Sequence, residues 1–238
     1  MSSEALLGET PSPDVTRQQL PPDTPPPFNT TRLTSLAAEC SRSGGRARQV
    51  QTIESAALSL FEMARSGDVM EVYALLRRFP SVWQSRDAEG CSALHAAASA
   101  GSMDMGQLLV HAGGADLVRW PDNDGWEALH YACANGHYSM AAWLLQSGAD
   151  LSARTDEGWQ PLHVAAHTGQ TSLARYLASQ KAGLRAQTKT GHEAVHLATD
   201  AGAVDFVQWL VRATDGAVIE ARDDDGWMPI HNAAHSGE

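Results

Sequence analysis

Five histidines recur at a nearly constant interval, and histidine is a side chain that binds metals and transfers protons. They are His95, His130, His163, His196 and His231, separated by 35, 33, 33 and 35 residues. Packed helical units would hold successive rings about 10 Å apart, whereas zinc needs its nitrogen ligands within about 2.1 Å of one ion. The spacing therefore argues against a metal centre, and we expect no metal and no cofactor.

Other signatures of catalysis are missing from the sequence. It contains no GxSxG, HExxH, Walker or dinucleotide-binding motif. The three cysteines, Cys40, Cys91 and Cys133, form no CxxC pair. The other five histidines lie outside the register and combine with no cysteine or carboxylate pair at ligand spacing. The sequence thus predicts a protein that is not an enzyme and has no small-molecule substrate.

Two series of glycines share the histidine interval and define the elements around it. One glycine precedes each register histidine by five residues: Gly90, Gly125, Gly158, Gly191 and Gly226. The second series is Gly101, Gly136, Gly169, Gly202 and Gly237. The small and apolar residues between them predict a short helix that a glycine ends in the left-handed conformation. An amphipathic helix follows, as at 139–145 and 204–211, and then an extended loop.

Residues 156–169, DEGWQPLHVAAHTG, resemble the ankyrin signature G-x-T-P-L-H-x-A-A-x-x-G. The resemblance implies an all-α solenoid of stacked helix-turn-helix units with finger loops, an ankyrin-repeat domain over 51–238. Its parts are a degenerate capping unit at 54–86, units at 87–121, 122–154, 155–187 and 188–222, and a partial unit at 223–238. The signature threonine is replaced in every unit, and proline remains only at Pro161 and Pro229. These departures do not change the predicted fold.

In this family the resembling histidine is structural, and its ring donates and accepts hydrogen bonds between adjacent units. We assign the same structural role to the five register histidines and to the turn glycines that precede them. Protonation would remove the acceptor nitrogen of each ring. Lowering the pH through about 6.5 is therefore predicted to loosen the stack.

The first 50 residues differ from the rest in composition and predict a disordered Pro/Ser-rich tail. Seven of the eleven prolines lie in the first 27 residues. Residues 1–50 hold five arginines and five acidic residues, so the formal charge of −11 falls on residues 51–238. An acidic domain repels nucleic acid and anionic membranes, and no apolar run reaches membrane-spanning length. We expect a cytoplasmic or nuclear protein that binds neither nucleic acid nor membrane.

Three tryptophans mark the position directly after the turn glycine: Trp126, Trp159 and Trp227, with His192 there in the fourth unit. By resemblance, this position lies on the projecting finger and faces the concave groove. Indoles at such a site are covered by a partner, because tryptophan is enriched at binding hot spots, or they pack against the neighbouring finger. A ring with two faces can do both.

Charged and polar finger residues flank these rings. Those predicted to contact a partner are Asn123, Asp124, Asp156, Glu157, Lys189, Asp224 and Asp225. Acidic finger edges favour a basic or arginine-bearing segment through charge and cation–π contact. The alternative is that these charges are only solvated, as most isolated surface charges are.

The sequence as a whole predicts a non-catalytic adaptor or scaffold that binds another protein, one with a basic segment, in the groove between fingers and inner helices. The competing interpretation is the ankyrin recognition arm of a larger enzyme or membrane channel whose effector domain lies beyond residue 238. It arises because the last unit stops just after its first helix.

Overall fold

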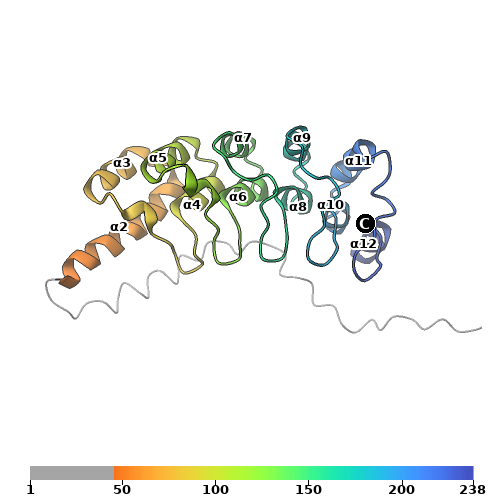
Figure 1. Ribbon diagram of the computed structural model, residues 1–238, viewed down its shortest axis with the longest axis horizontal. Helices are drawn as coiled ribbons and strands as arrows, with labels where there is room; N and C mark the ends of the chain where they lie inside the picture. Colours follow the sequence, from red (N-terminus) through yellow and green to blue (C-terminus); the bar gives the residue numbers. More distant parts are fainter. Residues whose placement is uncertain (1–45, 238) are drawn as a thin grey trace, which may run out of the picture.

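The computed structural model describes residues 46–237, with side chains described from residue 54 onward. Its helices are α2 (Arg46–Ser66), α3 (Val69–Arg78), α4 (Ala93–Ala100), α5 (Met103–Gly113), α6 (Ala128–Ala134), α7 (Tyr138–Gln146), α8 (Pro161–His167), α9 (Thr171–Ser179), α10 (Ala194–Asp200), α11 (Val204–Ala213) and α12 (Pro229–Ser236). Figure 1 shows helix pairs side by side along one axis, with loops extending to the same side. The predicted all-α solenoid is confirmed.

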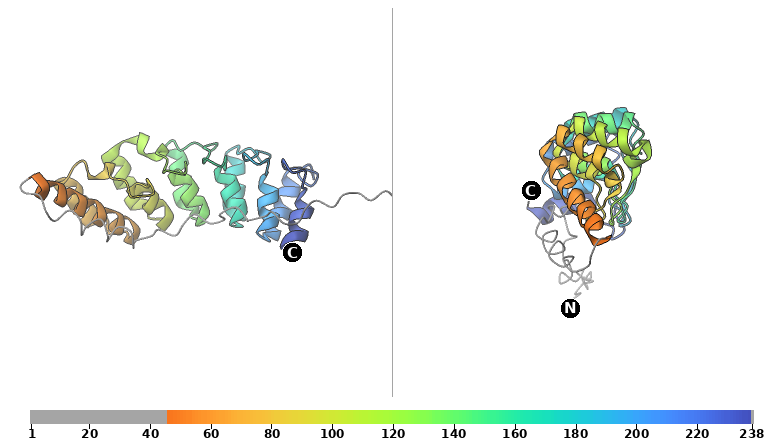
Figure 2. Two further views of the ribbon diagram at one scale, coloured as in Figure 1. Left: turned by 90° about the horizontal axis from the view of Figure 1, so that it is seen from below. Right: turned by 90° about the vertical axis from the view of Figure 1, so that its left-hand side faces the viewer.

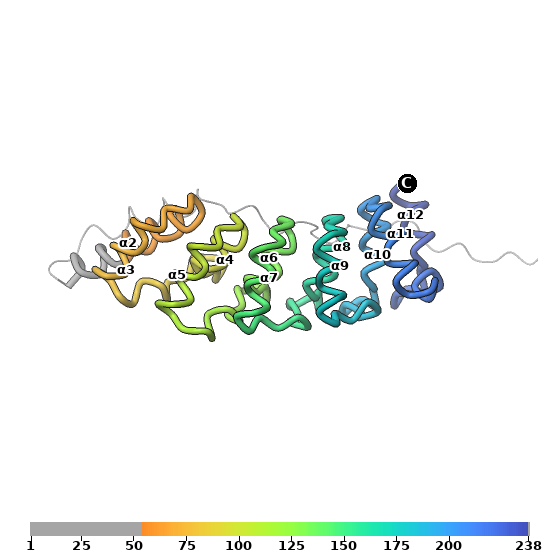
Figure 3. Tube along the Cα trace, turned by 90° about the horizontal axis from the view of Figure 1, so that it is seen from above, coloured from red at the N-terminus to blue at the C-terminus, as the bar shows by residue number. Residues whose placement is uncertain are grey.

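The helices form two rows. The even-numbered helices α4 to α12 form the inner row, next to the loops, and α3, α5, α7, α9 and α11 form the outer row (Figure 1). Seen from above, the units follow one another in chain order along the long axis (Figure 3). Each inner helix contacts the inner helix of the next unit. The end-on view of Figure 2 shows the units lying behind one another, so the molecule is elongated.

The core is a continuous layer between the rows. Inner helices bury alanines, such as Ala96 and Ala97 of α4, whose small side chains let adjacent helices approach closely. Leucines from both rows, such as Leu129 and Leu144, are fully buried between them. Because every unit buries its apolar faces only against its neighbours, stability accumulates along the stack.

Glycines end the inner helices where two units come close. Gly101 ends α4 with φ of 68°, a left-handed conformation that residues with a Cβ rarely adopt. A Cβ at this position would lie 2.6 Å from Nδ1 of His137 in the next unit. The glycine thus permits both the turn and the close approach.

The first unit differs from the others. Its inner helix α2 has 21 residues, whereas the other inner helices have seven or eight. Phe61, which the sequence places in the histidine position, is buried.

The predicted disordered tail, residues 1–50, falls mostly outside the described residues, and α2 begins at Arg46. Among the described helices, none combines the length and apolarity needed to cross a bilayer.

Candidate functional site

The finger loops are joined to one another near their tips. Each is a hairpin around its turn glycine, as the bridge between Gln187 and Glu193 shows. A backbone amide of each finger donates to a carbonyl of the preceding one: Asn123 to Glu89 (3.0 Å), Asp156 to Asp124 (2.8 Å), Lys189 to Glu157 (3.0 Å) and Asp224 to Thr190 (3.2 Å). The predicted partner-binding residues therefore occupy a rigid row, because their backbones are tied together.

The turn glycines are required by this close contact. Gly158 has φ of 83°, and a Cβ there would lie 2.8 Å from the amide nitrogen of Lys189 in the next finger. Gly125 stands in the same relation to Asp156, also at 2.8 Å. A side chain at either position would strain the turn and separate the fingers.

An aspartate or threonine at the start of each finger holds the backbone of the residue after the turn glycine, because its side-chain oxygen accepts a hydrogen bond from that residue's amide. Oδ1 of Asp122 accepts hydrogen bonds from the amides of Asp124 (2.9 Å) and Trp126 (2.8 Å). Asp223 holds the amide of Trp227 in the same way (2.7 Å). These carboxylates are committed to the loops, so they add little to the exposed charge of the fingers.

The tryptophans lie against the inner helix of their own unit. Trp126 contacts the rings of His130 and Tyr131, with centroids 5.7 and 5.6 Å apart. Trp159 meets His167 edge to face at 5.4 Å. All three predicted indoles are part-buried. Each ring therefore has contacts that hold it in place and also a part that remains open to solvent.

Trp227 and His192 occupy the corresponding positions in the last two fingers. Trp227 lies 6.1 Å from the ring of His231 and 5.8 Å from that of His235. His192 lies 5.7 Å from His196 at an interplanar angle of 86°. The residue after the glycine thus touches the register histidine of its own unit in the second, fourth and fifth fingers.

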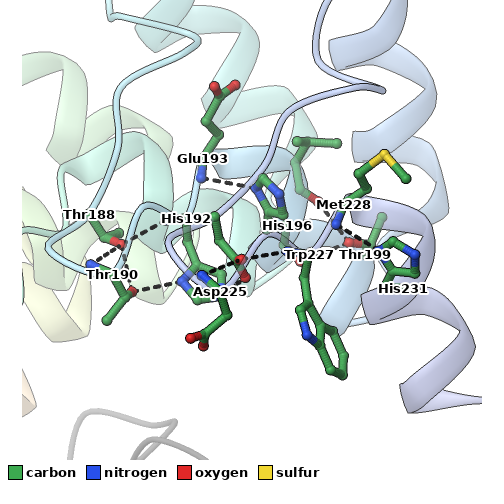
Figure 4. Close-up of polar contacts among 12 residues, drawn as sticks. Thr188, Thr190, His192, Glu193, His196, Thr199, Asp225, Trp227, Met228 and His231 are labelled. Atoms are coloured by element: carbon green, nitrogen blue, oxygen red, sulfur yellow. Dashed lines mark hydrogen bonds and ion pairs between the residues drawn. The ribbon is translucent and has the colours of Figure 1, made fainter. Parts of the chain in front are cut away.

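His192 also belongs to a polar cluster between the last two fingers (Figure 4). Its Nδ1 lies 2.7 Å from Oγ1 of Thr190, and its Nε2 lies 3.4 Å from Oδ2 of Asp223. The order hydroxyl, imidazole, carboxylate is that of a hydrolase triad. The amides of Thr190, Gly191 and His192, however, are bonded to Thr188, so none is free to stabilise an oxyanion. We interpret the cluster as a link between fingers.

The register histidines form hydrogen bonds in two directions. Nδ1 of His95 accepts from the amide of Ser92 (2.8 Å), and its Nε2 lies 3.2 Å from the carbonyl of Trp126 in the next unit. Because an amide can only donate, Nδ1 must be unprotonated, and the proton on Nε2 is donated to the carbonyl. His130 repeats this arrangement with the carbonyl of Trp159. The ring therefore acts in its neutral form.

Burial is the main cause of the pKa shifts of these rings. It lowers the pKa of His95, His130 and His163 from 6.5 to about 4. It also lowers the pKa of His196. Among the described residues, no group of three potential ligand side chains is placed to hold a metal ion.

The fingers carry exposed charged side chains of both signs. The exposed acidic side chains are those of Asp124, Asp156, Glu157, Asp224 and Asp225. The exposed side chains of Asn123 and Lys189 lie on the same fingers. We call this surface, together with Trp126, Trp159, His192 and Trp227, the finger face.

Three arginines absent from the predicted site also bond to the finger loops, and two of them link adjacent units. Nη1 of Arg86, Arg154 and Arg222 donates to the carbonyl of the turn glycine four residues later, at 2.9, 3.0 and 2.9 Å. Arg86 also reaches the carbonyl of Pro121 (2.6 Å), and Arg154 reaches that of Gln187 (2.7 Å). In the sequence, the feature that could have identified these arginines is their spacing of 68 residues, which equals two repeat units.

Comparisons with known proteins agree with this architecture. A family model described as ankyrin repeats (3 copies) matches residues 60–155 and 152–223. Protein phosphatase 1 regulatory subunit 27 of Mus musculus is 35% identical over 93 residues, 39% of this chain and 59% of the relative. Notch-regulated ankyrin repeat-containing protein of Xenopus laevis is 34% identical over 87 residues, 35% of this chain and 75% of the relative. The chain thus spans about three fifths of the first relative's length, and it belongs to the ankyrin-repeat family.

Proposed function

We propose that this chain is a non-catalytic interaction module that binds a protein partner on its finger face and the adjoining inner helices. The observation that carries the proposal is the row of part-buried tryptophans at one repeated finger position. Tied fingers hold this row rigid, so a partner would bind it without a large cost of ordering. The names of two relatives, a regulatory subunit and a Notch-regulated ankyrin repeat protein, are consistent with such a role.

The partner proposed is a protein with a basic segment. Five exposed acidic side chains lie on the same fingers as the tryptophans, with one exposed lysine. The guanidinium groups of the exposed arginines there, Arg86, Arg154 and Arg222, are bonded to carbonyls of the fingers. Complementary charge would speed association and orient the partner. Because the chain carries an acidic net charge of −11, nucleic acid is not proposed as a ligand. The expected location is the cytoplasm or the nucleus.

Affinity purification with single variants tests the proposal. Trp126→Ala and Trp159→Ala are expected to lose the same interacting protein, since both remove indoles from the finger face. Tyr138→Ala is the matched control, because Tyr138 is an exposed aromatic residue on outer helix α7. Retention of all interactors by both tryptophan variants, with loss in the Tyr138 variant, would place the binding surface on the outer row and refute the proposal.

A further inference from the structure

The interval between the finger-face aromatic residues restricts the conformation of a bound segment. Each finger is a tight hairpin joined to the next finger by a backbone hydrogen bond near its tip. Behind the fingers, each inner helix packs against the inner helix of the next unit, and packed helices lie about 8–10 Å apart. Equivalent residues of adjacent fingers are therefore separated by about the same interval.

Of the extended conformations, polyproline II matches this interval best, whereas an α-helix returns a side chain to the same face only at every seventh residue, after about 10.5 Å. It has three residues per turn and a rise of about 3.1 Å, so every third side chain returns to the same side after about 9.3 Å. A β-strand also advances about 10 Å in three residues, but side chains three apart point to opposite faces. A polyproline II segment lying along the stack can therefore present one side chain to each finger.

The chemistry of the finger face selects the side chains of that segment. Tryptophan is the strongest cation–π acceptor among the side chains, and arginine is its most frequent partner. The exposed carboxylates of Asp124, Glu157 and Asp225 each lie two residues before an indole-bearing turn position along the chain. A cation over an indole would thus also be near an acidic side chain. Aromatic surfaces are a recurrent docking site for proline-rich segments.

We infer that the bound segment is a polyproline II helix with arginine or lysine at every third residue, whose cations meet Trp126, Trp159 and Trp227. The inference rests on the proposed function, because it assumes that the finger face is the binding surface. The fourth finger, with His192 and Lys189, interrupts the row of indoles. The chain's own prolines 25–27 do not meet the requirement, since Arg17 and Arg32 are the nearest basic residues. The occupant is therefore a segment of another protein.

Three labelled synthetic peptides test the spacing by fluorescence anisotropy with the 238-residue chain. The first has four arginines separated by pairs of prolines, RPPRPPRPPRPP. The second has the same composition with the arginines paired at the ends, RRPPPPPPPPRR. The third replaces each arginine of the first with glutamate. At low salt, we expect the first to bind several-fold more tightly than the second, and the third not to bind. Equal affinity of the first two would show that charge alone acts and would overturn the inference.

Two variants test the positions of the cations. Trp159→Ala is expected to weaken binding of the first peptide by about two- to fivefold, the range for a cation–π contact at an exposed site. His192→Trp is expected to strengthen it by a similar factor, because it completes the row. The new ring has a place to pack, since Trp126 and Trp227 contact the register histidine of their own unit as His192 does. Tyr138→Ala should leave the affinity unchanged.

These outcomes separate this inference from the proposed function. Circular dichroism and thermal melting first establish that each variant is folded. Unchanged peptide affinity in both folded finger variants would overturn the inference. If Trp159→Ala loses a native partner while the chain shows no preference for threefold spacing, the proposed function stands and the inference fails. If neither effect is seen, both fail.

Discussion

The neutral histidines predict that the stack loses stability in mild acid. In the unfolded chain a histidine titrates near pH 6.5, whereas burial lowers the pKa of His95, His130 and His163 to about 4 in the folded chain. Below about pH 6.5 the unfolded state therefore binds more protons than the folded state. Stability is complete above that pH and falls progressively toward about pH 4.

The size of the loss follows from these pKa values. At about pH 5.5, one pH unit below the pKa of the unfolded histidine, each ring costs about 1.4 kcal/mol, and at about pH 7.5 it costs almost nothing. Three rings therefore remove about 4 kcal/mol of unfolding free energy between these two pH values. The lowered pKa of His196 adds a contribution of the same sign.

Glu127 opposes this effect. Burial, with a contribution from Asp150, raises the pKa of its carboxyl from 4.5 to about 7. Its Oε2 is buried without a hydrogen-bond partner among the described residues. A raised carboxyl pKa favours the protonated folded state, so stability rises by up to about 2 kcal/mol as the pH falls from about 7.5 to about 5.5. Because this carboxyl is only part-buried, solvent screening reduces its contribution, and the unmodified chain should show a net loss between about 2 and about 4 kcal/mol.

Glu127→Gln separates the two effects. Glutamine fits this position, because Gln160 caps the corresponding helix of the next unit. Urea unfolding followed by circular dichroism should show a loss of about 4 kcal/mol in this variant between about pH 7.5 and about pH 5.5. Adding His163→Asn should reduce that loss by about a third. A loss below about 0.5 kcal/mol in the Glu127→Gln variant would refute the assignment of neutral histidines.

Two further predictions concern the fingers and a buried thiol. Gly158→Ala should destabilise the chain by more than about 2 kcal/mol, because its Cβ would meet the amide nitrogen of Lys189 at 2.8 Å in a left-handed turn. Gly148→Ala, also left-handed but in open space, should cost only about 1 kcal/mol, and equal melting temperatures for the two variants would contradict this reasoning. Burial raises the pKa of the Cys91 thiol to about 12, so in a Cys40→Ser variant we expect a thiol reagent at about pH 8 to label Cys91 only after unfolding. Mass spectrometry of the labelled peptides measures this, and rapid labelling of the folded chain would argue against the burial.

The sequence determined the repeat and the architecture. The histidines and the two glycine series mark backbone requirements that recur in every unit, so their common interval fixed the order of turns and helices. Gly158 illustrates this, because a left-handed turn needs glycine wherever it occurs. Such local requirements can be recognised without knowing what the neighbouring unit contributes.

Only the tertiary structure decided how the finger side chains are used. Asp122 and Asp223 stand among the acidic residues of the fingers in the sequence, but both accept hydrogen bonds from their own loops. Arg154 was not singled out, because its second acceptor, the carbonyl of Gln187, lies 33 residues away. The position of Trp159 against His167 and the low pKa of His130 likewise depend on packing. Contacts within and between units set these properties, and a side chain's type does not reveal which neighbour will surround it.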